Sequence, residues 1–162
     1  MVSNVRLDSV HNYFKFVVRP NFEDHFGNIG DLRTATNLAN SLHSVRDWLL
    51  ESPKSEMTSR FGEIAGSKDF QNKLEKECPS LALISDIANA TKHMTLLIKR
   101  KRTKMSGASN LKPRGFGEGS YGKGSYGGPD IIIQMNNEAI FFDKTAKSVF
   151  SYWKNLLNEL ET

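Results

Sequence analysis

About half of this chain carries apolar residues at spacings of three and four, the repeat that buries one face of a helix. The pattern is clearest over 31–51, and similar patterns cover 9–19, 67–77, 79–94 and 143–160. In the 31–51 segment the predicted inner face consists of Leu32, Ala35, Leu38, Ala39, Leu42, Val45 and Leu49. A chain with this pattern is expected to fold mainly as packed helices.

Prolines and capping residues predict where these helices begin and end. Asp8 or Ser9 can cap the first helix, and Asp143 can cap the last. Pro20 is expected to end the first helix, because a residue that precedes proline avoids helical angles. The polar segment 52–66 has no clear period, so it predicts a loop with no more than a turn of helix. In the 79–94 helix, the predicted apolar stripe is Leu83, Ile87, Ala90 and Met94.

The helical pattern is interrupted before the last helix. Segment 95–103 lacks a helical stripe and predicts a strand whose outer half is charged. Two apolar runs, 130–135 and 138–143, are separated by Asn136-Asn137, a pair that predicts a tight hairpin. We therefore expect a predominantly helical α+β fold. It has about five helices in a bundle and a small three-stranded antiparallel sheet before the last helix.

Length and composition restrict the class of protein. The 162 residues suit a single domain, 1–162, with a Gly/Tyr-rich basic loop at 105–129 inside it. The single Cys78 excludes an internal disulfide and a multi-cysteine metal site, and it fits a reducing compartment. The sequence shows neither a signal-peptide pattern nor an apolar run of the ~18 residues that a membrane span needs. We expect a cytoplasmic protein that does not enter the membrane.

Positive charge is concentrated in segment 92–123, although the whole chain carries only +4. The segment has nine cations against the single acid Glu118, which makes it +8 and leaves −4 for the remaining residues. Such a segment can attract phosphate backbones or acidic partners. The alternative is an ordinary solvated strand and loop rich in Lys and Arg.

Glycine and tyrosine are repeated within this region. Eight of the 22 residues of 107–128 are glycine, and Gly-Ser-Tyr-Gly occurs at both 119–122 and 124–127. Two matches to G-x-G-x-x-G do not predict a dinucleotide or kinase site, because no strand–loop–helix context surrounds them. Aromatic rings beside cations can instead stack on bases of single-stranded nucleic acid, or they can pin an ordered loop to the sheet or to a partner. The candidate contact residues for RNA, DNA or an acidic protein are Lys99, Arg100, Lys101, Arg102, Lys112, Arg114, Tyr121, Lys123 and Tyr126.

A second group of polar residues lies on two predicted helices. On the 79–94 helix, Asp86, Asn89 and His93 follow one stripe at i, i+3 and i+7, and on the 31–51 helix His43 and Asp47 are four residues apart. If the two helices pack antiparallel, the five side chains converge. They could then serve as a divalent-metal site or as a histidine base oriented by an acid. The alternative is a buried network that fixes the register of the helices, and we assign no metal or cofactor.

Three further candidates carry weaker signals. Glu23, Asp24 and His25 could ligate a metal, but three adjacent residues rarely all face one ion. His11 is expected to be exposed or to be a satisfied polar residue. Cys78 is interpreted as a packing residue.

The two polar helices resemble a known pattern. Segments 41–48 and 86–93 look like a group of uncharacterised small bacterial helical proteins, in which a His…Asp-aromatic helix precedes an Asp-x-Ala-Asn-x-x-Lys-His helix and a Gly/Tyr-rich loop. More distantly, the bundle is similar to HEPN-type ribonucleases. The Arg-to-His spacing of that family occurs here at Arg6–His11 and at Arg19–His25. By analogy with such small bundles, the resemblance implies a homodimer.

The sequence therefore leaves two alternative functions open. The first is a non-enzymatic binding or interaction module whose contact surface is the basic Gly/Tyr-rich loop. The second is a HEPN-like ribonuclease or metal-dependent hydrolase with the candidate catalytic residues His93, Asp86, Asn89, His43 and Asp47.

Overall fold

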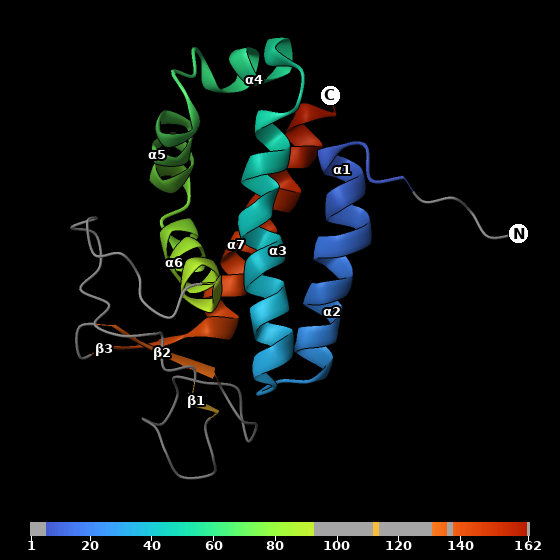
Figure 1. Cartoon of the computed structure of the whole chain (residues 1–162). Coiled ribbons are helices and arrows are strands. Elements are labelled where there is room, and N and C mark those ends of the chain that lie inside the picture. The colour runs from blue at the N-terminus through green and yellow to red at the C-terminus, as the bar shows by residue number, and fades with distance from the viewer. Residues whose placement is uncertain (1–5, 93–111, 114–130, 136–137, 162) are drawn as a thin grey trace, which may run out of the picture.

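The computed structural model describes residues 6–92, 112–113, 131–135 and 138–161 (Figure 1). Its helices are α1 (Val10–Tyr13), η1 (Phe14–Val18), α2 (Arg19–Gly27), α3 (Leu32–Leu50), α4 (Lys54–Phe61), α5 (Ser67–Glu77), α6 (Ser80–Lys92) and α7 (Phe142–Leu160). Its strands are β1 (Lys112–Pro113), β2 (Ile131–Met135) and β3 (Glu138–Phe141). The predominantly helical α+β class expected from the sequence is confirmed.

The first helix does not end at Pro20, as the sequence predicted, but continues to Gly27. Its start is as expected, because the Ser9 side chain accepts a hydrogen bond from the backbone N–H of Asn12. Before the proline the helix widens into the π segment η1, where the Arg19 N–H bonds to the Phe14 carbonyl, five residues back. Proline has no N–H and its ring crowds the preceding turn, so a wider turn lets the chain pass through it without a break.

Helix α3 is the centre of the bundle and matches the prediction closely. Asp31 caps it by accepting a hydrogen bond from the Arg33 N–H, and Glu51 follows its last turn. Six of the seven predicted inner residues are fully buried, namely Ala35, Leu38, Ala39, Leu42, Val45 and Leu49. The seventh, Leu32, is 40% exposed because it lies in the first turn, beyond the cover of the neighbouring helices.

Helix α6 packs along α3, but a different face is buried from the one predicted (Figure 1). The buried residues are Leu81, Ile84, Ile87 and Ala88, whereas Leu83 and Ala90 are half-buried. Met94 lies outside the described residues. The buried stripe is rotated from the predicted one because α6 also contacts α5 and α7, and the sequence does not reveal those contacts.

The connection between α3 and α5 contains more helix than expected. Segment 52–66 was predicted to be a loop, yet α4 takes up eight of its residues. Met57 supplies one buried side chain, and the short helix is too polar to show a clear period. Helix α5 spans the predicted residues, with Phe70 and Leu74 buried as expected.

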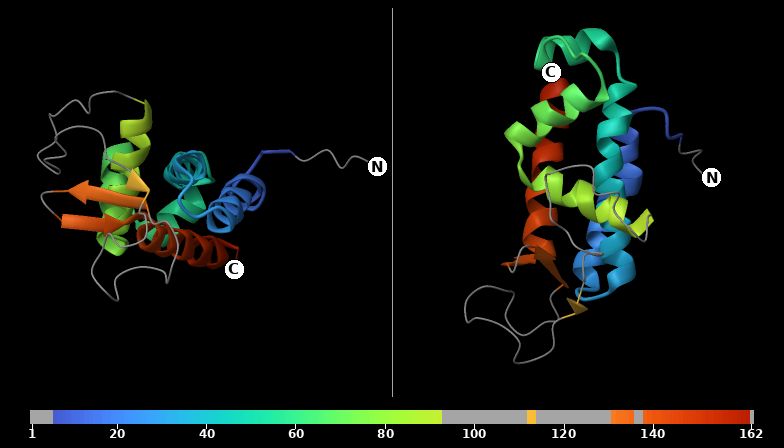
Figure 2. Two further views of the ribbon diagram at one scale, coloured as in Figure 1. Left: turned by 90° about the horizontal axis from the view of Figure 1, so that it is seen from below. Right: turned by 60° about the vertical axis from the view of Figure 1, so that its left-hand side comes forward.

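The strands lie at the end of the bundle where α7 begins (Figures 1 and 2). Strands β2 and β3 pair antiparallel with Met135 opposite Glu138, which confirms the expected hairpin, although Asn136-Asn137 itself lies outside the described residues. The sheet is smaller than expected. Its third member, β1, has only two residues and pairs with β2, and the predicted strand at 95–103 lies outside the described residues. Helix α7 follows β3 directly.

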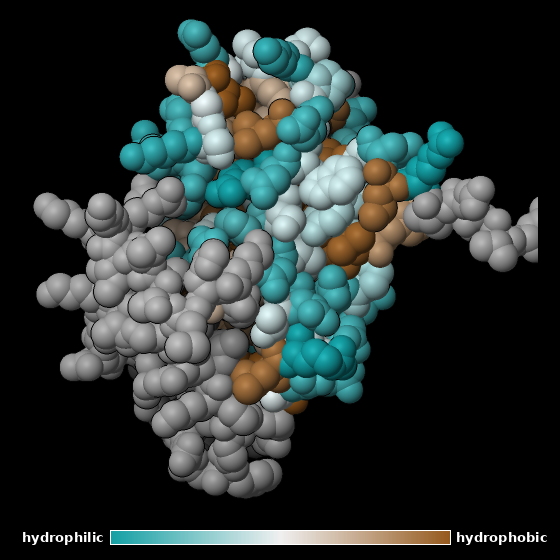
Figure 3. Space-filling view, viewed as in Figure 1, coloured by the Kyte–Doolittle hydropathy of each residue, from teal (hydrophilic) through white to brown (hydrophobic). Residues whose placement is uncertain are grey.

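The described surface gives little sign of an extended apolar face. On the side seen in Figure 3 most residues are hydrophilic and the hydrophobic ones form small separate patches. The large hydrophobic residues exposed in the described part are Leu7, Phe16 and Leu32. None of the described helices has the length and the hydropathy that crossing a membrane requires.

Candidate functional site

Helices α3 and α6 contact each other, as the sequence predicted, but His43 bonds to a residue outside the predicted group. His43 on α3 is buried, and its Nδ1 atom lies 3.1 Å from the Ser85 hydroxyl of α6. Ser85 precedes Asp86 in the sequence, so the hydrogen bond joins the helices one position away from the predicted stripe. The α3–α6 seam, defined here by His43, Ser85 and Asp86, is therefore a real helix–helix contact.

Asp47 does not take part in this seam. Its side chain is 57% exposed and accepts hydrogen bonds from the adjacent Arg46, with a closest distance of 2.9 Å. Arg46 also donates to the Gln71 side chain of α5. Nearby, Tyr13 stacks on Trp48 at 4.9 Å, and burial raises the pKa of the Tyr13 hydroxyl. The expectation that Asp47 would converge with His43 is wrong, because Asp47 faces the solvent side of α3.

The remaining members of the predicted catalytic group belong to α6 or lie beyond its described end. Asp86 and Asn89 are half-buried on α6, and His93 lies outside the described residues. Across the described part of the chain, no three His, Cys, Asp or Glu side chains are grouped as ligands for a metal ion.

Most of the predicted nucleic-acid contacts also fall beyond the described residues. These are Lys99, Arg100, Lys101, Arg102, Arg114, Tyr121, Lys123 and Tyr126. Lys112 belongs to β1, where its backbone is opposite Ile132 of β2. The structure shows two places where the cationic segment joins the described fold. Lys92 is the last residue of α6, and Lys112 lies in β1, which pairs with β2 of the hairpin.

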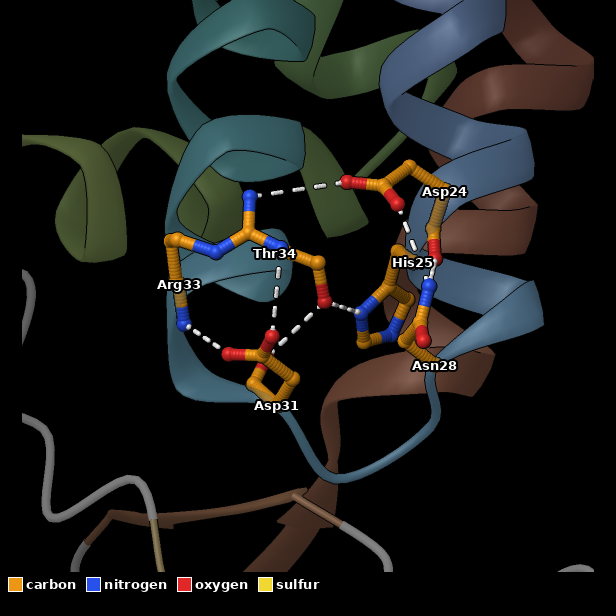
Figure 4. Close-up of polar contacts among 6 residues, drawn as sticks. All are labelled: Asp24, His25, Asn28, Asp31, Arg33 and Thr34. Carbon is orange, nitrogen blue, oxygen red and sulfur yellow. Dashed lines mark hydrogen bonds and ion pairs between the residues drawn. The ribbon is translucent and has the colours of Figure 1, made fainter.

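The most completely buried polar cluster is one that the sequence did not predict. His25 of α2 is fully buried, its Nε2 atom lies 2.8 Å from Oδ1 of Asp143, and its Nδ1 atom lies 3.2 Å from the Thr34 hydroxyl. Figure 4 shows the ring turned inward beside Thr34, whereas Asp24 and Arg33 lie on the outer side. The cluster links α2, α3 and α7 through residues 118 positions apart.

The hydrogens of this cluster follow from its acceptors. The Asp143 carboxylate can only accept, so His25 donates through Nε2–H. The Thr34 hydroxyl lies 2.9 Å from the Asp31 carbonyl, which already accepts from the Ala35 N–H. The Thr34 hydroxyl therefore links the His25 ring to the N-terminal end of α3.

Asp143 was expected to cap α7, and this is wrong. Phe141 occupies the cap position without a side-chain hydrogen bond, and Asp143 lies one residue inside the helix. Its carboxylate is in the first turn, where the helix dipole stabilises negative charge, and it faces His25 instead of the free N–H groups. No hydrogen-bond partner of its Oδ2 atom is found in the described structure.

The His25 side chain has no exposed surface and the Asp143 side chain is 12% exposed, so the cluster is suited to positioning the three helices. His25 also belongs to Arg19–His25, one of the two HEPN-like Arg-to-His spacings. In this pair His25 is fully buried while Arg19 is exposed. In the other, the Nε2 atom of His11 lies 3.1 Å from the Leu157 carbonyl and 3.5 Å from Glu161. No sequence signal connects His25 to Asp143, since their pairing depends on the packing of α2 against α7.

Comparison with models of protein families found no match, and neither the comparison with curated proteins nor that with solved structures found one. Arguments about function therefore depend on this chain's own residues.

Proposed function

We propose that this protein is a non-enzymatic binding module that holds the cationic segment 92–123 against a nucleic acid. The observation that carries the proposal is the separation of charge: +8 in that segment against −4 in the rest of the chain. A separation of this size raises the local concentration of polyanions around one part of the molecule.

The attachment of the segment supports the same proposal. Its first cation, Lys92, ends α6, and Lys112 lies in β1, which pairs with β2 of the hairpin. The hairpin in turn continues directly into the C-terminal helix, α7. A cationic segment held at both places by a folded scaffold loses less conformational freedom on binding than a free basic tail would.

A nucleic acid fits the residues better than an acidic protein does. The segment combines lysine and arginine with Phe116, Tyr121 and Tyr126, and aromatic rings add stacking on bases to the attraction between cations and phosphates. Binding of this kind tolerates many sequences and weakens steeply as salt releases the counterions of the backbone.

The test is binding of a fluorescent single-stranded RNA or DNA of about twenty nucleotides, measured by anisotropy at several salt concentrations. We expect micromolar binding that weakens with salt, and a clear loss of affinity in the variant K99Q/R100Q/K101Q/R102Q. The matched control is R6Q/K54Q/K68Q/K76Q, which removes four positive charges from exposed residues of the described surface. Undetectable or salt-independent binding by the wild type, or equal loss in both variants, would contradict the proposal.

A second candidate function is a HEPN-like or metal-dependent hydrolase at the α3–α6 seam. The observation in its favour is that His43 is held 3.1 Å from the Ser85 hydroxyl, and that Asp86 is the next residue. Cleavage of total RNA, with and without divalent metal, tests it. Cleavage lost in both His43→Gln and His93→Gln would favour the hydrolase, and intact RNA at high protein concentration would exclude it.

A further inference from the structure

A second group of cations lies far from the segment 92–123 in the sequence, on the folded bundle. Helices α2 and α7 are neighbours, as the left view of Figure 2 shows. Aromatic side chains of the two helices are in contact. Phe22 stacks on Phe150 with ring centroids 4.0 Å apart, and the Lys147 ammonium lies 4.6 Å from the Phe26 ring. These contacts identify the faces of the two helices that border the α2–α7 seam.

Four exposed cations lie along this border, and we call them the cationic seam: Lys15, Arg19, Lys147 and Lys154. On α7, Lys147 and Lys154 are three residues before and four residues after Phe150, so all three share a face. On the N-terminal helix, Arg19 is seven residues before Phe26, which also places both on one face. Lys15 is four residues before Arg19, close to one turn of the helix that includes η1, so it lies on the same side as Arg19.

The cations of the seam differ in their partners from Arg33, Arg46 and Arg60. Arg33, Arg46 and Arg60 each form an ion pair with a carboxylate. No such pair is recorded for any member of the cationic seam in the described part of the chain, where Lys15 and Lys147 instead lie over phenylalanine rings.

The carboxylates around the seam do not neutralise it. Asp143 is buried against His25, and Glu161, at the far end, lies 3.5 Å from His11. Glu23 is the exposed acid on the same part of α2, and it lies one residue beyond Phe22 and so further from α7. Four cations against Glu23 and the terminal Glu161 leave an excess of positive charge along the two helices.

We infer that the cationic seam is a second contact for the nucleic acid, one that binds its phosphate backbone without reading its sequence. The inference rests on the proposed function, and it assigns the contact to the folded bundle in addition to segment 92–123. Lys147 and Lys154 are separated by two helical turns, or ~10 Å along the axis. Cations along both sides of the seam suit an extended chain of regularly spaced charges, and one strand of DNA presents a phosphate every ~3.4 Å. The seam starts beside the hairpin to which the cationic segment is attached, so one strand could follow both surfaces.

The experiment compares three proteins: the wild type, the seam variant K15Q/R19Q/K147Q/K154Q and the control R6Q/K54Q/K68Q/K76Q. Each variant replaces three lysines and one arginine, all exposed, so the net charge changes equally. Affinity for a single-stranded oligonucleotide of about twenty nucleotides is measured from low to physiological salt. Each phosphate contact that is lost lowers the slope of log K against log salt by ~0.7, so four contacts correspond to a change of about 3.

We expect the seam variant to lose at least about tenfold in affinity and to show the lower slope, while the control changes little. Equal behaviour of the two variants, with the wild type still binding, would overturn the inference and leave the proposed function intact. No binding by the wild type would overturn both. Competition by poly-glutamate as effective as by RNA of the same charge would replace the nucleic acid with an acidic protein and also overturn the inference. Circular dichroism and thermal unfolding of each variant exclude misfolding as the cause.

Discussion

The buried His25–Asp143 pair should be one of the strongest single determinants of stability in this protein. His25 has no exposed surface, and the Asp143 side chain is 12% exposed. Replacing His25 with leucine keeps an apolar side chain in the space of the ring but leaves the carboxylate buried without its donor. Leaving a buried charge without its partner costs ~3–5 kcal/mol.

The size of the effect can be stated for two measurements. We expect His25→Leu to lower the free energy of unfolding by ~3–5 kcal/mol in urea, followed by circular dichroism. For a chain of this length each kcal/mol shifts Tm by ~2–4 °C, so Tm should fall by roughly 6–20 °C. Asp143→Ala should cost less, ~1–3 kcal/mol, because a neutral imidazole left without its acceptor is easier to bury than a carboxylate.

A double-mutant cycle distinguishes the pair from two separate packing effects. The variant His25→Leu with Asp143→Ala removes both polar groups, so its loss should be smaller than the sum of the single losses. The control is Asp24→Ala, which removes a 44% exposed carboxylate 3.7 Å from Arg33 and should change stability by less than ~1 kcal/mol. Additive losses in the cycle, or a His25→Leu variant no less stable than the control, would refute the reasoning.

Three further predictions follow from buried or shared polar groups. Trp153→Phe removes the indole donor that lies 3.0 Å from the Leu42 carbonyl and leaves a small cavity, and should cost ~1–3 kcal/mol in urea unfolding. Arg60→Gln breaks ion pairs with Glu77 and Glu159 that are partly exposed, so it should cost less than ~1 kcal/mol, and a loss above ~2 kcal/mol would contradict this. Burial raises the pKa of the Cys78 thiol, and burial with the hydrogen bond to Glu77 raises that of Tyr152. The unfolded chain therefore releases these protons first, so stability should be complete below about pH 8.5 and fall as pH rises through 9 to 11. Unfolding followed against pH should show a smaller fall for Tyr152→Phe, and an identical profile would argue against the shift.

The sequence predicted the helices well where an apolar stripe is regular. The bounds of α3 and α5 and most of the inner face of α3 could be found because their apolar residues follow the helical repeat regularly. The prediction was wrong at Pro20 because a π turn has no sequence signature as strong as proline itself. It was also wrong for the buried face of α6, which is rotated by packing against several helices at once.

The candidate sites were harder to predict for a different reason. Spacing within a helix correctly suggested that α3 and α6 meet through His43, but it could not give the relative rotation of the helices, which makes Ser85 the partner. The His25 cluster joins residues from three helices, and each looks ordinary in its own segment. Long-range polar pairs of this kind depend on tertiary packing, which local patterns do not contain.

The direct passage from β3 into α7 has a mechanical consequence. Phe141 ends the strand and also caps the helix, so no intervening loop can absorb a rotation of the hairpin. Helix α7 has 19 residues and is therefore ~28 Å long, and its far end reaches the Arg60 and His11 contacts. A rotation of the hairpin would therefore be transmitted directly to the first turn of α7, where Asp143 bonds to His25.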